Sequence, residues 1–457
     1  MHDAAAVVQK GMLFGMNQTL VAVTIMIICY LVIFTERLNR AVIALFCGGL
    51  MVILGVLSQA EAIRAIDFNT LALLVGMMII VSVTEKTGIF QYIAIWSAKK
   101  VRANPRGLLA VLTAVTALLS GYIDSVTTVL LMTPIIFQIT KRLGVRPYPY
   151  LMLSIFSCNI GGAATLIGDP PNILVGSTLN LNFMDFVVNM MPLSYVLVIV
   201  LIIVFDFIWG RKLAATPDAR ELVMQMNEKD SITDKRLLKQ SLSVLIGVII
   251  TFMFAHYIHL ETGTIAMFGA SIMLILYSMD FKQQDRDHKV EEVFNLVDWT
   301  TIFFFMGLFV VVFGIESTGV LTLIGHIFVE AAGGVVQKLI FLFLWVGSVF
   351  SCVIDNIPFV ATMIPIIKSI EADMGGRDAV MPIWWALMMG ACYGGNGTLI
   401  ASSANVVVAG ISMKEGHHIK FFRFMAWGLP VTFVSIVISS IYLYFRYPAY
   451  THMPLPM

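Results

Sequence analysis

The chain has 457 residues, of which 59% are hydrophobic and 12% charged, and its formal net charge is +1. Soluble globular domains carry about 25% charged residues, so this composition excludes an ordinary soluble protein and indicates a polytopic membrane protein. The near-neutral charge provides no basic surface for nucleic acid. The five cysteines all lie in apolar segments and lack the spacing of metal ligands or of a disulfide framework.

Apolar segments long enough to cross a membrane recur along the whole chain. A hydrocarbon core about 30 Å thick needs about 20 predominantly apolar residues per helix. On this basis the candidate spans are 18–35, 41–58, 68–85, 148–176, 192–210, 239–258, 262–279, 297–315, 380–410 and 426–446. The sequence therefore predicts an all-α polytopic protein embedded in the lipid bilayer.

Two further apolar segments, 107–140 and 337–368, are interrupted at their centres by polar residues. These residues are Asp124-Ser-Val-Thr-Thr128 and Asp355-Asn-Ile-Pro-Phe359. A carboxylate at the bilayer centre costs roughly 3 kcal/mol on insertion scales, so neither segment makes a good single span. We expect two re-entrant helical hairpins with the polar residues at their tips. The alternative for each is one plain helix that tolerates an Asp.

Two of the candidate spans, 148–176 and 380–410, contain related interruptions. The first holds Gly161-Gly-Ala-Ala-Thr-Leu-Ile-Gly-Asp-Pro-Pro-Asn172, and the second holds Gly394-Gly-Asn-Gly-Thr-Leu-Ile-Ala-Ser-Ser-Ala-Asn405. Glycine and proline disfavour a continuous helix, and irregular backbone at membrane depth is tolerated where it is buried in protein or lines a cavity. Both spans are therefore predicted to be broken helices that hold a ligand.

The two halves of the chain repeat one another. Asp124 and Asp355 stand 231 positions apart, as do Pro134 and Pro365, and the glycine-rich interruptions stand 233 positions apart. Each half contributes about five spans and one hairpin, which is an odd number of crossings, so the second half must be inverted. Inverted-topology repeats with broken helices are typical of secondary transporters.

The distribution of Lys and Arg predicts the orientation. Most of these residues lie in the loops 36–41, 98–106, 141–146, 210–236, 280–290 and 411–425. The positive-inside rule places these loops in the cytoplasm, so both termini are expected outside. The hydrophilic segment 211–236 is predicted to be a cytoplasmic linker between the halves.

Candidate ligand-binding residues gather at the hairpin tips and in the broken helices, where carboxylate, hydroxyl, amide and carbonyl oxygens suit a small cation or a hydrogen-bonded oxyanion. They are Asp124, Ser125, Thr127, Thr128, Gly161, Gly162, Thr165, Gly168, Asp169, Asn172, Asp355, Asn356, Gly394, Gly395, Asn396, Thr398, Ser402, Ser403 and Asn405. A Na⁺ ion is expected at Asp124, Ser125, Asp355 and Asn356. The alternatives are that the acids cap half-helices and that the glycines serve close helix packing.

The two hairpin tips and the two glycine-rich interruptions resemble motifs of the ion transporter superfamily. They occur in the same order as in that superfamily, and the resemblance covers nearly the whole chain. That superfamily includes arsenite permeases, D-type sodium/proton antiporters, citrate carriers and divalent-anion/sodium symporters, and the chain is most similar to its melanosomal P-protein-like branch. The resemblance implies a homodimer in which a transport part moves past a scaffold as an elevator. It assigns 1–106 and 237–330 to the scaffold and 107–210 and 331–457 to the transport part.

The chain departs from one branch of this superfamily at the hairpin tips. The dicarboxylate symporters carry Ser-Asn-Thr at each tip, whereas the aligned residues here are Asp124-Ser-Val126 and Asp355-Asn-Ile357. Two carboxylates repel a dianion, and no Lys or Arg lies within the polar tips to compensate. Citrate and succinate are therefore less favoured than a monovalent cation or neutral arsenous acid.

The sequence thus predicts a secondary active transporter with Na⁺ or H⁺ as coupling ion and no other cofactor. Na⁺/H⁺ exchange and arsenite efflux are favoured equally, coupled transport of chloride or of a carboxylate such as citrate is the alternative, and an ion channel is more remote. An intramembrane aspartyl protease is disfavoured because its two acids must share a proton, whereas these acids enter on hairpins from opposite sides. The expected location is the cytoplasmic (inner) membrane of a prokaryote.

Overall fold

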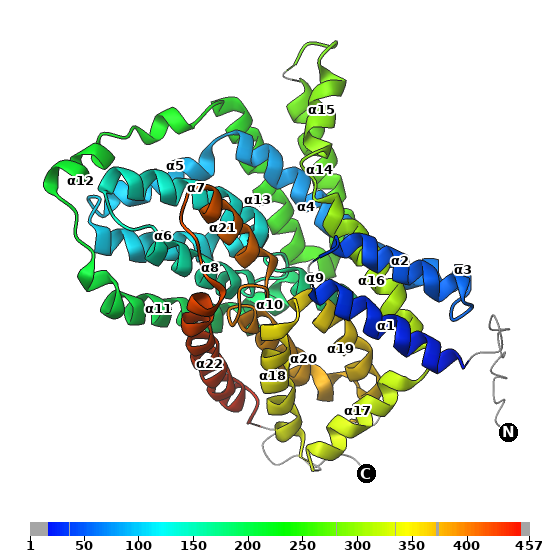
Figure 1. Cartoon of the computed structure of the whole chain (residues 1–457). Helices are drawn as coiled ribbons and strands as arrows, with labels where there is room; N and C mark the ends of the chain where they lie inside the picture. The colour runs from blue at the N-terminus through cyan, green and yellow to red at the C-terminus, as the bar shows by residue number, and fades with distance from the viewer. Residues whose placement is uncertain (1–16, 36, 280, 334, 372–373, 449–457) are drawn as a thin grey trace.

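The protein is helical throughout the part that the structure describes. The computed structural model describes residues 17–35, 37–279, 281–333, 335–371 and 374–448, and these ranges contain no strand. Within them, nine helices are long and apolar enough to cross a membrane, and three shorter helices are also apolar. The prediction of an all-α polytopic membrane protein is therefore confirmed (Figure 1).

The first repeat runs from α1 to α11. Its helices are α1 (Gln18–Phe34), α2 (Arg40–Ile53), α3 (Gln59–Ala65), α4 (Phe68–Lys86), α5 (Ile89–Lys100), α6 (Pro105–Tyr122), α7 (Ser125–Leu143), α8 (Tyr148–Gly162), α9 (Pro170–Thr178), α10 (Phe183–Asn189) and α11 (Met191–Ile208).

The second repeat runs from α13 to α22. Its helices are α13 (Lys235–Ile258), α14 (Thr262–Met279), α15 (Arg286–Phe294), α16 (Trp299–Glu316), α17 (Val320–Ala331), α18 (Val336–Val353), α19 (Asn356–Glu371), α20 (Arg377–Gly394), α21 (Ser403–Lys414) and α22 (Phe421–Arg446).

Both predicted hairpins are present as helix pairs whose tips point into the molecule. The first consists of α6 and α7, and the second of α18 and α19. At each tip one extended residue, Ile123 or Ile354, separates the end of the first helix from an aspartate that precedes the second helix. The interruptions that the sequence placed at these aspartates are therefore the turns of the hairpins.

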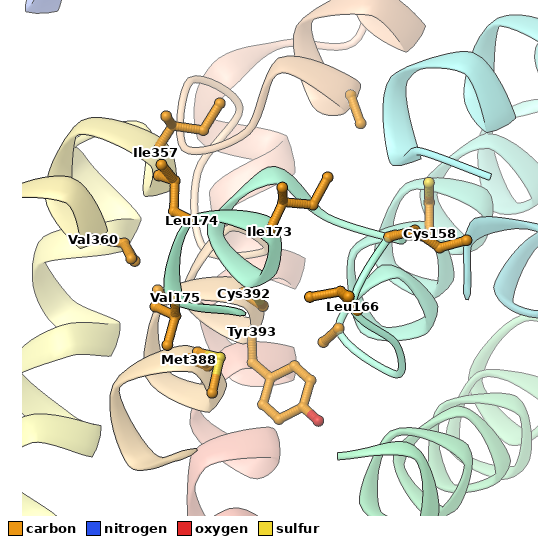
Figure 2. Packing of buried hydrophobic residues seen from close by; sticks show 14 of the residues in the cluster. Cys158, Leu166, Ile173, Leu174, Val175, Ile357, Val360, Met388, Cys392 and Tyr393 are labelled. Atoms are coloured by element: carbon orange, nitrogen blue, oxygen red, sulfur yellow. The ribbon is translucent and has the colours of Figure 1, made fainter. Parts of the chain in front are cut away.

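Both predicted broken helices are also present. The chain leaves α8 at Gly162 and enters α9 at Pro170, and in the second repeat it leaves α20 at Gly394 and enters α21 at Ser403. The short helix α9 packs against α19 and α20 of the other repeat. Figure 2 shows Val175 of this helix beside Val360 of α19.

The structure adds helices where the sequence predicted none. The helices α5 and α17 each contain 12 residues and follow Gly88 and Gly319, which have positive φ. A search for spans of about 20 apolar residues passes over such short helices.

The predicted linker 211–236 contains helical segments. It holds a short helix, α12 (Pro217–Met224), and α13 already begins at Lys235, so the linker ends before residue 236. The Nζ of Lys99 in α5 lies 2.7 Å from Oε2 of Glu228. This ion pair fastens the linker to the first repeat.

The two repeats are joined by two equivalent helix pairs. In the described residues α4 packs along α14, and α16 packs along α2, as Figure 1 shows for the blue α2 and the yellow-green α16. A Cβ atom added to Gly76 would lie 2.6 Å from the carbonyl carbon of Ala266, and one added to Gly307 would lie 2.3 Å from that of Ala44. Small residues thus allow close approach of these helices. Whether they form a scaffold separate from a transport part stays a prediction.

The broken helices are held by two asparagines at equivalent positions. The Nδ2 of Asn172 donates to the carbonyl oxygen of Thr165 at 2.8 Å, and Nδ2 of Asn405 donates to that of Thr398 at 2.9 Å. Each asparagine oxygen accepts from the other repeat, from Nδ2 of Asn159 at 2.9 Å for Asn405 and from the thiol of Cys392 at 3.6 Å for Asn172. The asparagines therefore close their own loops and bind the repeats together.

We expect that Gly76→Ala and Gly307→Ala each lower the stability of the protein. The added methyl group must displace backbone of the facing helix, and such overpacking costs about 1–3 kcal/mol. Thermal unfolding of the purified protein in detergent measures the effect. The control is Gly49→Ala in α2, where an added Cβ meets nothing within 4 Å. Equal melting temperatures for all three variants would contradict the close packing.

We also expect Asn405→Ala and Asn172→Ala to be destabilising, because each leaves buried carbonyl groups unpaired at a cost of about 1–3 kcal/mol per group. The control is Asn295→Ala at the exposed end of α15, which should change stability by less than about 0.5 kcal/mol. The stabilities are compared by measuring the melting temperatures of wild type and all variants in the same detergent. Variants as stable as the control would mean that the glycine-rich loops close without these side chains.

Candidate ion-binding site

The hairpin tips and the ends of the broken helices surround one small cavity. Its volume is about 180 Å³. Among its lining residues are seven that the sequence predicted, namely Asp124, Ser125, Thr127, Asp169, Asn356, Ser402 and Ser403. Four further polar side chains, Arg40, Ser82, Asp298 and Thr301, also line it. Asp298 is exposed whereas Asp169 is 5% exposed, so Asp298 lies towards the open side and Asp169 lies at depth.

Asp124 at the first hairpin tip caps the helix that follows it. Its Oδ1 accepts from the backbone N–H groups of Val126 at 3.0 Å and Thr127 at 3.1 Å, and its Oδ2 accepts from Oγ1 of Thr127 at 2.5 Å. The capping role that was one alternative is therefore present. A carboxylate oxygen has two lone pairs, so this aspartate can also accept a ligand from the cavity.

Asp355 at the second hairpin tip also caps its helix, with Oδ1 accepting from the N–H of Ile357 at 3.0 Å. Its Oδ2 lies 3.2 Å from Nη1 of Arg40 and 3.3 Å from Oγ of Ser403. Asp355 itself lines a neighbouring cavity of about 200 Å³, and Arg40 lines both cavities. The two equivalent aspartates thus have different electrostatic surroundings.

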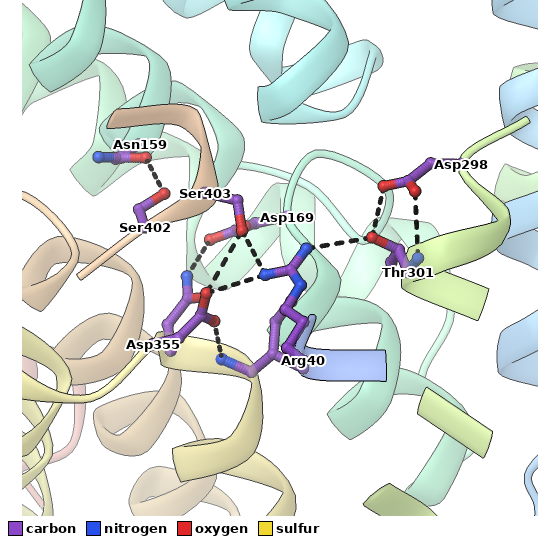
Figure 3. Close-up of polar contacts among 10 residues, drawn as sticks. Arg40, Asn159, Asp169, Asp298, Thr301, Asp355, Ser402 and Ser403 are labelled. Atoms are coloured by element: carbon purple, nitrogen blue, oxygen red, sulfur yellow. Dashed lines mark hydrogen bonds and ion pairs between the residues drawn. The ribbon is translucent and has the colours of Figure 1, made fainter. Parts of the chain in front are cut away.

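Arg40 connects this tip to the start of α16 (Figure 3). Its Nη1 donates to Oγ of Ser403 at 2.7 Å, and its Nη2 donates to Oγ1 of Thr301 at 3.2 Å. Thr301 in turn donates to Oδ2 of Asp298 at 2.5 Å. The guanidinium also lies 5.2 Å from the centroid of the Phe304 ring, within the range of a cation–π interaction.

The broken helices contribute Asp169 and Ser402 at equivalent positions. Neither side chain caps the helix that follows it. Instead, Oδ2 of Asp169 accepts from Nδ2 of Asn356 at 3.2 Å, and Oγ of Ser402 donates to Oδ1 of Asn159 at 3.1 Å (Figure 3). No basic side chain in the described ranges forms an ion pair with Asp124 or Asp169, so both acids stay available to a ligand.

The remaining predicted residues lie outside the cavity wall. The hydroxyls of Thr165 and Thr398 donate to the carbonyl oxygens of Gly121 and Cys352, and the buried hydroxyl of Thr128 has no hydrogen-bond partner. The others away from the wall are Gly161, Gly162, Gly168, Asn172, Gly394, Gly395, Asn396 and Asn405. An added Cβ would lie less than 3 Å from a neighbour at Gly161, Gly162, Gly168 and Gly394, so these glycines serve close packing.

Arg40 gives one tip carboxylate a basic partner that lies outside the tip sequences themselves. It was counted among the cytoplasmic charges of the loop 36–41, and no local sequence signal connects it to Asp355, which is 315 positions away. The repeat could have identified Asp298, because it stands 231 positions after Asp67. Each of these aspartates caps a helix by accepting from the backbone N–H of the threonine three residues later. The repeat pattern carried that signal, whereas Arg40 has no basic counterpart.

Comparisons with known proteins show which family the chain belongs to. A family model described as citrate transporter matches residues 30–390. An uncharacterised transporter of Mycobacterium bovis is 38% identical over 438 residues, which cover 95% of this chain and all of that protein. The human P protein is 31% identical over 511 residues, which cover 93% of this chain and 60% of the P protein.

A solved structure shares the fold. The crystal structure of the YdaH transporter of Alcanivorax borkumensis, whose title reports an unusual topology, matches with a TM-score of 0.60 at 13% identity. The match covers 96% of this chain and all of the YdaH chain. The chain therefore belongs to the citrate transporter family of the ion transporter superfamily and is a multi-pass membrane transporter.

Proposed function

We propose that this protein is a secondary active transporter whose coupling ion, Na⁺ or H⁺, binds at Asp124 and Asp169. The observation that carries the proposal is the cavity of about 180 Å³, which both acids line and in which neither has a basic partner among the described residues. A charged carboxylate at membrane depth is costly unless it is paired. A cation or a proton in the cavity removes that cost.

The other groups on the wall suit the same ligand. The hydroxyls of Ser125, Ser402 and Ser403 and the amide of Asn356 line the cavity together with the acids. Such oxygen ligands are those that hard cations prefer. In the predicted orientation the exposed Asp298 lies towards the cytoplasm, and this conformation takes up or releases its ion on that side.

Among substrates, these features support Na⁺/H⁺ exchange best. A site with two adjacent acids can bind either a metal cation or protons, and competition between them at one site is sufficient for exchange. Efflux of arsenite remains open, because neutral arsenous acid can hydrogen-bond to the hydroxyl and amide groups without meeting a charge penalty. Movement of a transport part past a scaffold, as an elevator, would expose the cavity to each side in turn.

A carboxylate such as citrate is the second candidate. It is favoured by Arg40 on the cavity wall and by the description of the matching family model as a citrate transporter. Arg40 is already engaged by Asp355, Ser403 and Thr301, so an anion would have to compete for it and would also meet Asp124 and Asp169. Citrate would therefore have to enter together with cations.

The cellular setting forms part of the proposal. Mycobacterial relatives support the cytoplasmic membrane of a bacterium as the location, and the superfamily resemblance supports a homodimer. Both termini are expected outside, although residues 1–16 and 449–457 lie beyond the described residues. We propose no enzymatic role, because the chain belongs to a transporter family.

We expect Asp124→Asn and Asp169→Asn each to reduce cation-driven proton movement by at least about tenfold, which corresponds to ~1.4 kcal/mol, because the amide cannot balance a bound cation. The assay uses proteoliposomes with an internal pH dye and a preset proton gradient, to which Na⁺, Li⁺ or K⁺ is added. The control is Asp218→Asn, which removes an exposed carboxylate in the linker helix α12.

The wild-type response identifies the substrate class. Collapse of the proton gradient by one cation, lost in the two site variants and kept in the control, supports Na⁺/H⁺ exchange. If no cation acts on wild type, the same vesicles are tested with arsenite and with citrate under imposed Na⁺ and H⁺ gradients. Coupled transport that persists at the wild-type rate in both site variants would remove the acids from the mechanism.

A further inference from the structure

The two hairpin tips are equivalent in sequence position but not in charge. Each tip presents an aspartate that caps the following helix. At the first tip, Asp124 faces Asp169 and the exposed Asp298 across the cavity and has no basic partner in the described part of the chain. At the second tip, the guanidinium of Arg40 lies 3.2 Å from Oδ2 of Asp355. The repeat therefore contains two carboxylate sites, of which one already holds a positive charge.

Arg40 is bound in place by more than its ion pair. It donates to Ser403 at 2.7 Å and to Thr301 at 3.2 Å, and it lies over the Phe304 ring. Its side chain is 27% exposed and that of Asp355 is 17% exposed, so solvent screens the pair only in part. The hydroxyl of Ser403 lies close to both charges, at 2.7 Å from Nη1 and 3.3 Å from the carboxylate. The guanidinium thus has the oxygen neighbours that a bound cation would have.

The position equivalent to Arg40 in the other helix pair holds no basic residue. Arg40 precedes Ala44 by one helical turn, and Ala44 is the residue that approaches Gly307. In the inverted pair, Ala266 approaches Gly76, and the residue one turn before Ala266 is Thr262. A neutral threonine therefore stands where the other repeat has Arg40. The difference lies in a single position of otherwise equivalent packing.

We propose that Arg40 is a built-in counter-cation that occupies the second of two duplicated cation sites, so that each protomer binds one exchangeable coupling ion and not two. The exchangeable ion binds at Asp124 and Asp169, and this part of the inference rests on the proposed function. At Asp355 the guanidinium excludes a free cation, because two positive charges at one carboxylate repel one another.

Removal of the arginine should open the second site. Arg40→Gln leaves Asp355 and Ser403 free, so binding of radioactive Na⁺ to the purified protein at saturation should rise from one ion per protomer to two. The double variant Arg40→Gln with Asp355→Asn should return to one ion. Arg40→Lys keeps the positive charge and should stay at one. Arg37→Gln, which removes an exposed arginine three residues earlier, is the matched control and should also stay at one.

If the coupling ion is H⁺, the same variants are compared by the number of protons that they take up. If wild type binds no Na⁺, protons taken up per protomer are counted by potentiometric titration of the same variants, and Arg40→Gln should gain one proton that depends on Asp355. Two Na⁺ ions per protomer in wild type would overturn the proposal. An unchanged count in Arg40→Gln would also overturn it, as would loss of citrate binding in this variant without a gain of cation binding.

The experiment separates this inference from the proposed function. Asp124→Asn that binds as much Na⁺ as wild type would remove the proposed coupling site, whereas the comparison of Arg40→Gln with its double variant concerns Asp355 alone. If the size-exclusion profile shows that Arg40→Gln does not fold, the number of ions bound per protomer is measured for Asp355→Asn instead. We expect this variant to keep the wild-type count, because Asp355 is not part of the exchangeable site, and loss of the bound ion would overturn the proposal.

Discussion

Two hairpins and two broken helices require four helices to begin in the interior of the molecule, and the first amide groups of each must find partners there. Asp124 and Asp355 provide acceptors for α7 and α19. The start of α9 avoids the requirement, because Pro170 and Pro171 carry no N–H group. Asp124, which lines the cavity, is therefore also a residue that allows its hairpin to form, so helix capping and the proposed ion binding fall on the same side chain.

The inverted repeat makes each half dependent on the other. Gly76 and Gly307 receive the facing helices of the opposite repeat, and Asn172 and Asn405 accept hydrogen bonds from it. A cavity built at this junction takes one wall from each half, so that Asp124 of the first hairpin and Asn356 of the second line the same space. Divergence between the halves therefore changes the two sides of this cavity unequally.

The sequence was sufficient to predict most of the fold, because hydrophobic length, helix-breaking residues and the repeat are local or periodic signals. It placed both hairpin tips, both breaks and seven residues of the cavity wall. It could not place Arg40, since this arginine reaches Asp355 only through the packing of α2 against α16. It also missed α5 and α17, which are too short for a span and pack against α6 and α19.

The charges around the cavity limit what the protein can carry. Arg40 balances Asp355, whereas Asp124 and Asp169 face the cavity without a fixed counter-charge in the described residues. An anion that entered alone would add negative charge beside these acids and would gain little from a guanidinium that already has three partners. A cation, a proton or a neutral hydroxylated molecule avoids this penalty, and a polycarboxylate avoids it when cations bind with it. On the proposed function, Arg40 in α2 therefore bears on both the number of coupling ions and the class of substrate.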